Sequence, residues 1–172
     1  MFKVLICREF DQRALGDILN LEQACYPQSW QYPNANEYYA DMLGRENSIH
    51  IFLRENEVTT GYLLARPLSE LYADLCEYDP ALCEDPTGYY METIGVHPEF
   101  IGRGGGACLM DALTDEAINR FGCRLLSAHA RTKTGLNEMI KRKYPDRLLE
   151  VRHIAQWHFG GNEPYEYIVW GI

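Results

Sequence analysis

VHPEFIGRGGGACLM, residues 96–110, is the stretch of sequence that constrains the fold most strongly. Four of its residues are glycines within five positions: Gly102, Gly104, Gly105 and Gly106. An apolar run precedes them and a helical pattern follows. Glycine in such numbers costs backbone entropy, so we expect something to approach this backbone closely. A strand, a glycine-rich turn and a helix expose free amides at a helix N-terminus, which favours a bound phosphate.

The glycine stretch matches neither of the common nucleotide-binding motifs. A strict GxGxxG is absent, and so is the GxxxxGK[ST] of a P-loop. A dinucleotide fold also needs several strand–helix repeats, whereas the apolar pattern predicts one. A nucleotide-binding oxidoreductase is therefore the weakest of the functions that we weigh.

Hydrophobic periodicity predicts an alternation of strands and helices along the whole chain. The helices are predicted over 11–25 and 34–47, after the glycine loop through Phe121, and over 134–143, with a short helix inside 68–88. Strands are predicted over 3–10, 48–54, 58–67, 89–98, 123–130, 148–159 and 166–172. We expect 48–54 and 58–67 to form a hairpin, and the strands before and after the glycine-loop helix to be parallel.

Composition limits the class of protein. A chain of 172 residues with 47% hydrophobic residues suits a single domain over residues 1–172. A net charge of −9 argues against a nucleic-acid partner. No signal peptide and no apolar run of about 20 residues is visible, so we expect a soluble cytoplasmic protein without membrane contact.

The six cysteines contain no CxxC pair and suit buried reduced thiols. A Cys76–Cys83 bridge and a catalytic cysteine are the alternatives. No metal site is expected, and a homodimer stays open.

The quoted stretch resembles motif A of the GNAT N-acetyltransferase superfamily, which runs V-x-P and then [Q/R]-x-x-G-x-[G/A] at the start of a helix. Val96 and Pro98 match its beginning, and 101–106 match the rest, with Ile101 where the family has Gln or Arg. The order of predicted elements matches the family over essentially the whole chain. The resemblance implies an α/β (α+β) fold. Its mixed, mostly antiparallel sheet has about seven strands, a splay between strands 4 and 5, and about four flanking helices.

The resemblance also implies acetyl-CoA as co-substrate and names the residues that would hold it. The pyrophosphate would lie on the loop amides of Ile101, Gly102, Arg103, Gly104, Gly105 and Gly106. The pantetheine arm would pair with the backbone of Ile94 and Val96, and Gly95 would permit a bulge there. Asn137 and Tyr144 match the family's N-x(6)-Y segment, in which the Asn contacts pantetheine and the Tyr protonates the leaving thiolate. Pro145-Asp146-Arg147 replaces the family's usual continuation, so packing is the other reading of Tyr144.

Acetyl transfer to an amine needs the amine neutral, so a base must remove a proton. Glu92 lies four residues before Val96, where many GNAT members carry Glu, and is the candidate base. A backbone hydrogen bond at the strand is its alternative role. Tyr90 shares the strand face of Glu92 and is a candidate for the acceptor pocket. His129 could face the same cleft or be structural.

Two segments are candidates for binding the amine acceptor. Tyr26, Trp30 and Tyr32 lie in CYPQSWQYP (25–33), which resembles the acceptor loop of ribosomal-protein alanine acetyltransferases; the alternative is ordinary loop packing. Residues 68–88 hold six carboxylates and no Lys or Arg, so they form either a lid for a cationic amine or a solvated loop. Lys141, Arg142 and Lys143 are candidates for the 3′-phosphate of CoA.

We therefore expect an N-acetyltransferase that moves an acetyl group directly from acetyl-CoA to a primary amine, small or peptidic. A non-catalytic acyl-CoA sensor on the same fold is the alternative.

Overall fold

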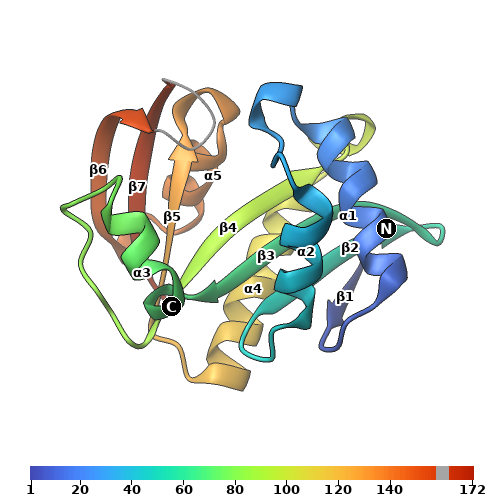
Figure 1. The fold of residues 1–172 in the computed structure, drawn as a ribbon, viewed down its shortest axis with the longest axis horizontal. Coiled ribbons are helices and arrows are strands. Elements are labelled where there is room, and N and C mark those ends of the chain that lie inside the picture. Colours follow the sequence, from blue (N-terminus) through green and yellow to red (C-terminus); the bar gives the residue numbers. More distant parts are fainter. Residues whose placement is uncertain (158–162) are drawn as a thin grey trace. The chain divides into compact units, whose positions relative to one another are not determined.

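The computed structural model describes residues 1–157 and 163–172 and contains one seven-stranded mixed sheet (Figure 1). The strands hydrogen-bond in the order β1-β2-β3-β4-β5-β7-β6. Their bounds are β1 Lys3–Cys7, β2 Ile49–Glu55, β3 Val58–Pro67, β4 Gly88–Val96, β5 Leu125–Arg131, β6 Leu148–Trp157 and β7 Glu163–Gly171.

Within the described residues the chain forms five α-helices and four 3-10 turns. The helices are α1 Gln12–Cys25, α2 Ala35–Gly44, α3 Leu68–Cys76, α4 Gly105–Phe121 and α5 Leu136–Lys143. The 3-10 turns are η1 Gln28–Trp30, η2 Pro98–Phe100, η3 Thr132–Thr134 and η4 Pro145–Arg147. None of the described helices is long and apolar enough to cross a membrane.

The chain divides into two compact units, of which the first comprises residues 1–65 and 93–116. Its strands β1, β2 and β3 are antiparallel. The hairpin between β2 and β3 turns through Asn56 and Glu57, both at positive φ. Helices α1 and α2 bury their apolar faces on this sheet, where Ile18, Tyr39 and Tyr62 belong to one hydrophobic cluster.

The second unit comprises residues 66–92 and 117–172. The first residues of β4, Gly88–Tyr90, pair in parallel with Leu125–Ser127 of β5. β5, β7 and β6 continue antiparallel. Helix α3 packs with Leu68, Leu71 and Leu75 against a cluster that includes Trp157 and Tyr167.

The mixed sheet, the hairpin, the parallel β4–β5 pair and the helices predicted from the sequence are confirmed. Element ends differ in several places. β1 ends at Cys7 rather than residue 10, because Asp11 accepts a hydrogen bond from Arg13 N and begins α1. The predicted strand 148–159 ends at Trp157, and its last two positions lie outside the described residues.

All six cysteines are free thiols, so the alternative of a Cys76–Cys83 bridge is wrong.

Candidate active site

Backbone conformation and close packing explain the glycines of the loop before α4. Gly102 and Gly104 have φ of +80° and +86°, which L side chains rarely adopt. Gly105 has a different reason, because an added Cβ would lie 3.2 Å from Leu53 Cδ1 and 3.4 Å from Val96 Cγ1. Two of the glycines thus set the path of the loop, and a third lets the start of α4 pack closely on the sheet.

The amides at the start of α4 form the donor set of the loop. Cys108 N donates to Gly104 O at 3.1 Å. The amides of residues 105–107 therefore lie in the first turn, where no helical acceptor precedes them. Earlier in the loop, Ile101 N donates to Pro98 O at 3.3 Å and Arg103 N to Phe100 O at 3.4 Å. Of the amides predicted to hold a pyrophosphate, those of Ile101 and Arg103 are thus already bonded within the loop.

The Arg103 side chain pairs with Glu55, which lies at the end of β2. Its Nη2 donates to both carboxylate oxygens, at 2.7 and 2.8 Å. The guanidinium also lies over the rings of Phe2 and Phe100, 5.5 and 4.9 Å from their centroids. The hydrogen bonds from the N-terminal amine and Arg103 lower the pKa of Glu55. Arg103 therefore braces the glycine loop against β2.

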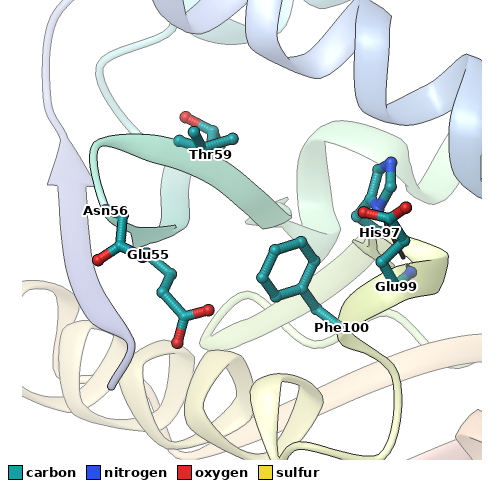
Figure 2. A pocket seen from close by; sticks show the side chains of 7 residues that line it. Glu55, Asn56, Thr59, His97, Glu99 and Phe100 are labelled. Atoms are coloured by element: carbon teal, nitrogen blue, oxygen red, sulfur yellow. Dashed lines mark hydrogen bonds between the residues drawn. The ribbon is translucent and has the colours of Figure 1, made fainter.

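A pocket of about 350 Å³ lies beside this brace (Figure 2). Figure 2 shows Glu55 at the end of β2 and Asn56 of the following turn on one side, and His97, Glu99 and Phe100 on the other. None of the site residues predicted from the sequence lines it.

The backbone of β4 has one edge turned to β3 and one turned away. His97 N donates to Thr60 O at 2.8 Å, and a Cβ on Gly61 would lie 2.9 Å from Gly95 O. Peptide groups alternate along a strand, so Ile94 and Val96 direct theirs to the opposite edge. Those are the two residues predicted to pair with pantetheine.

Packing gives a reason for glycine at position 95. An added Cβ would lie 2.8 Å from Tyr62 Cε1 and 3.4 Å from both Cys25 Sγ and Tyr26 Oη. The Tyr26 hydroxyl donates to Ile94 O at 2.5 Å and lies 3.3 Å from Thr93 Oγ1.

Glu92, the predicted base, is held by Arg66 at the end of β3. Arg66 Nε lies 2.6 Å from Oε1, and Nη2 donates to Oε2 at 3.1 Å. Both side chains are nearly buried, with 11% and 6% exposed. One hydrogen bond and one close charge contact therefore join the two groups, and together they restrict the orientation of the carboxylate.

Tyr90 and His129 are joined in a buried chain of polar contacts. Tyr90 Oη lies 2.9 Å from His129 Nδ1, and His129 Nε2 lies 3.0 Å from Asp79 Oδ2. Arg152 holds the same carboxylate with two nitrogens, at 2.5 and 2.8 Å. Since an ionised Asp79 accepts from Nε2–H, His129 Nδ1 is left to accept the Tyr90 proton.

The charge states of this chain follow from burial and from its partners. Burial acts to raise the pKa of Asp79, but the hydrogen bonds from His129 and Arg152 outweigh it and lower that pKa well below its usual range. Burial lowers the pKa of His129 despite the adjacent carboxylate. The imidazole also stacks on Trp157, with ring centroids 3.9 Å apart. Neutral His129 and ionised Asp79 thus anchor the segment after α3 to β5 and β6.

Asn137 lies in the first turn of α5 and is buried. Its Nδ2 donates to Glu166 Oε2 at 2.9 Å, while its Oδ1 is buried and has no hydrogen-bond partner among residues 1–157 and 163–172. Lys141 Nζ lies 2.7 Å from the same Glu166 oxygen. Burial acts to raise the pKa of Glu166, but the bonds from Lys141 and Asn137 outweigh it and lower that pKa.

Tyr144 ends α5 and is buried, and its ring stacks on Trp170 with centroids 5.9 Å apart. Lys143 Nζ lies 5.7 Å from the Tyr144 ring centroid. With Lys141 on Glu166, two of the three basic residues predicted for a phosphate have other contacts.

Glu22 of α1 accepts hydrogen bonds that hold the predicted acceptor loop. The buried Glu22 Oε1 accepts from Tyr32 N and from Tyr39 Oη, each at 3.1 Å. The Tyr32 ring stacks on Tyr38, with centroids 4.0 Å apart. Trp30 ends η1, where its amide donates to Pro27 O. The loop therefore has a defined conformation that rests on a carboxylate.

The acidic segment divides into structural and exposed carboxylates. Asp79 is buried in the chain described above. Asp85 Oδ1 accepts from Thr87 N and Oγ1, each at 2.7 Å, and so closes the turn before β4. The other four carboxylates are exposed: Glu70, Asp74, Glu77 and Glu84. No cluster of His, Cys, Asp and Glu suited to a metal occurs in residues 1–157 or 163–172.

The predicted site residues fall in both units. The first unit holds the glycine loop, Ile94, Val96, Tyr26, Trp30 and Tyr32; the second holds Glu92, Tyr90, His129, Asn137 and Tyr144. Sequence reasoning missed the partners Arg66, Asp79, Arg152 and Glu22. For two of them a signal existed. Arg66 is the one charge in the apolar run YLLAR, and Glu22 stands one turn after Ile18 on the apolar face of α1.

The sequence matches the Acetyltransferase (GNAT) family over residues 15–139. No curated protein sequence matches the chain significantly. Solved structures share its fold. The ribosomal-protein-S18-alanine N-acetyltransferase from Escherichia coli superposes with a TM-score of 0.72 at 16% identity, covering 100% of this chain and 94% of that one.

Two further structures are similar. Arabidopsis thaliana NAA60 in complex with acetyl-CoA has a TM-score of 0.71 at 17% identity, with 99% and 100% of the two chains covered. The polyamine N acetyltransferase of Drosophila melanogaster has a TM-score of 0.69 at 12% identity, with 99% and 100% covered. At these identities the likeness shows the fold.

Proposed function

Because the chain belongs to the GNAT acetyltransferase family, we propose that it is an acetyl-CoA-dependent N-acetyltransferase, built as a single domain over residues 1–172. The observation that carries the proposal is the glycine loop at the start of α4. Gly102 and Gly104 take positive φ there, and the first-turn amides of the helix follow directly. A helix N-terminus with such a loop suits a pyrophosphate.

Two further observations support acetyl-CoA as the donor. Ile94 and Val96 direct their peptide groups to the edge of β4 away from β3, where an extended amide-bearing arm would pair as an added strand does. Asn137 Oδ1 is a buried acceptor without a hydrogen-bond partner in the described part of the chain, and an amide N–H of pantetheine would satisfy it. Acetyl-CoA supplies the activated acetyl group as a thioester.

Glu92 is the proposed base that takes the proton from the acceptor ammonium, directly or through water. Arg66 is a positioning residue for it, because two contacts to the guanidinium hold the carboxylate in one orientation. An amine without its proton has the lone pair that attacks the acetyl carbonyl. Backbone amides of β4 would stabilise the charge on the carbonyl oxygen.

Tyr144 is the proposed acid that returns a proton to the departing thiolate. Its ring is fixed by the stack on Trp170 at the end of α5. Fixing a proton donor in place lowers the cost of aligning it in the transition state. Asn137 lies two turns earlier on the same helix, as the proposed contact for the arm that carries the thiol.

The proposed acceptor is a cationic primary amine, either small or at the end of a peptide. Four exposed carboxylates and no basic residue in 68–88 favour a cation near this segment. His129 bonds to Asp79 of this segment, and Tyr90 bonds to His129. The loop proposed to line the acceptor pocket contains Tyr26, Trp30 and Tyr32.

Turnover measured as CoA release across amines, polyamines and peptides tests the proposal. We expect release with at least one cationic amine, and thermal stabilisation by acetyl-CoA and CoA but not by NAD or ATP. Stabilisation by acetyl-CoA with no release across the panel would favour a non-catalytic acyl-CoA sensor. Stabilisation by NAD or ATP alone would contradict the donor site.

A further inference from the structure

The hydroxyl of Tyr26 occupies the backbone acceptor that the proposed donor site needs. Tyr26 Oη donates to Ile94 O at 2.5 Å. Ile94 directs its peptide group away from β3, to the edge of β4 on which a pantetheine amide would pair. Tyr26 and an incoming amide donor would thus bond to the same carbonyl oxygen, where the bond from Tyr26 leaves one of the two lone pairs.

Tyr26 is fitted to this contact by its surroundings. Burial raises the pKa of Tyr26 to about 12, so the phenol keeps its proton and remains a donor at neutral pH. Gly95 supplies the space, since a Cβ there would lie 3.4 Å from Tyr26 Oη and 2.8 Å from Tyr62 Cε1. The close approach is thus to Tyr62, and Tyr26 Oη lies at ordinary contact distance from the same position.

The same residue begins the proposed acceptor loop. Tyr26 N donates to Glu22 O at 3.0 Å as the C-cap of α1, and Gln31 Nε2 donates to Tyr26 O at 2.9 Å. A displacement of Tyr26 that moves its backbone would therefore reach the loop through the bond from Gln31. Glu22 also holds the loop, because its carboxylate accepts from Tyr32 N.

We propose that Tyr26 couples the two substrate sites, with its hydroxyl closing the Ile94 carbonyl in the free protein and yielding it when acetyl-CoA binds. The inference rests on the proposed donor site on β4. Displacement of Tyr26 then changes the conformation of 26–33 before the acceptor arrives. Tyr26 would then position the acceptor loop in addition to lining the acceptor pocket.

The test is calorimetric titration of acetyl-CoA, without acceptor, into the wild type and Tyr26→Phe. Loss of a competing neutral hydrogen bond should tighten acetyl-CoA by about twofold to tenfold. Tyr72→Phe is the matched control, because Tyr72 Oη also donates to a backbone carbonyl, that of Leu82 at 3.5 Å, in the other unit. We expect this control to bind acetyl-CoA as the wild type does.

Hydrogen exchange of residues 26–33 provides the second readout. Acetyl-CoA should speed exchange there in the wild type, and Tyr26→Phe should exchange at the faster rate with or without it. Unchanged or weaker acetyl-CoA affinity in Tyr26→Phe, or slower exchange on binding, overturns the coupling and leaves the donor site standing. Failure of the wild type to bind acetyl-CoA at all overturns the proposed function, and this inference with it.

Discussion

Arg66 and Glu92 form an ion pair in which Arg66 Nε lies 2.6 Å from Glu92 Oε1 and Nη2 donates a hydrogen bond to Oε2 at 3.1 Å. The pair joins the end of β3 to β4, and it presents a nearly buried carboxylate in a fixed orientation. A carboxylate held in this way suits a base that must accept a proton from an ammonium group bound in one position. Removal of either partner leaves a charge without compensation.

Glu92→Gln should lower kcat by about 10²- to 10⁴-fold, the usual contribution of one general base, and leave the acetyl-CoA Kd unchanged. CoA-release kinetics and calorimetry measure the two quantities. Glu116→Gln is the matched control, because Glu116 is also a buried glutamate paired with an arginine, Arg8 at 3.3 Å. Equal kcat values for Glu92→Gln and the control would leave Glu92 a structural role only.

Tyr144→Phe should lower kcat by about 10- to 10⁴-fold with little change in acetyl-CoA affinity, since its proton is needed only as the thiolate leaves. The stack on Trp170 survives the change, so the fold should hold. Tyr89→Phe is the control, a buried tyrosine that packs on Phe121. Turnover at the wild-type rate in Tyr144→Phe would reduce Tyr144 to packing.

Gly104→Asp should weaken acetyl-CoA binding at least about tenfold, because it strains a φ of +86° and places a negative charge beside the pyrophosphate. Gly122→Asp is matched in backbone strain: its φ is +60° and an added Cβ also meets nothing within 4 Å. Calorimetry should show near-normal affinity for the Gly122 variant. Equal Kd values in the two variants would place the pyrophosphate elsewhere.

Conversion of Glu70, Asp74, Glu77 and Glu84 to amides should raise the KM of a cationic acceptor about tenfold and flatten its salt dependence. Asp79 is left out, since it is buried between Arg152 and His129. Acetyl-CoA affinity should stay constant. Steady-state kinetics at low and high salt measure both effects. An acceptor KM equal to that of the wild type at both salt concentrations would show that the segment is only a solvated loop.

Acidification should unfold the protein partly through His129. Its pKa is lowered from 6.5 by burial, so the unfolded chain binds a proton that the folded protein does not, and stability falls as the pH drops below 6.5. The lowered pKa of Asp79 extends this loss to pH values below 3.8. Arg152 and Glu150 are the other charges that act on the imidazole.

His129→Gln should therefore lose less stability than the wild type between pH 7 and 5, as measured by urea unfolding. His153→Gln changes an exposed histidine of β6 and serves as the control, with the wild-type slope expected. A wild-type slope in His129→Gln would show that His129 does not carry this dependence.

Local sequence determined much of this protein, because its signals need no distant partner. The alternation in 48–67 predicts the β2–β3 hairpin, and the glycines of 102–106 predict a turn into a helix. Backbone sterics decide such features: Gly102 and Gly104 do take positive φ. The GNAT motif in the same stretch agreed with the family found for residues 15–139.

The partners of the site residues were decided by tertiary structure alone. Arg66 meets Glu92 across 26 positions, Tyr26 meets Ile94 across 68, and Arg152 meets Asp79 across 73. Such pairings depend on sheet register and helix packing, which no local pattern encodes. From the sequence, a carboxylate in an acidic loop is therefore predicted to be solvated. Only the tertiary structure shows that Asp79 is buried and paired with Arg152.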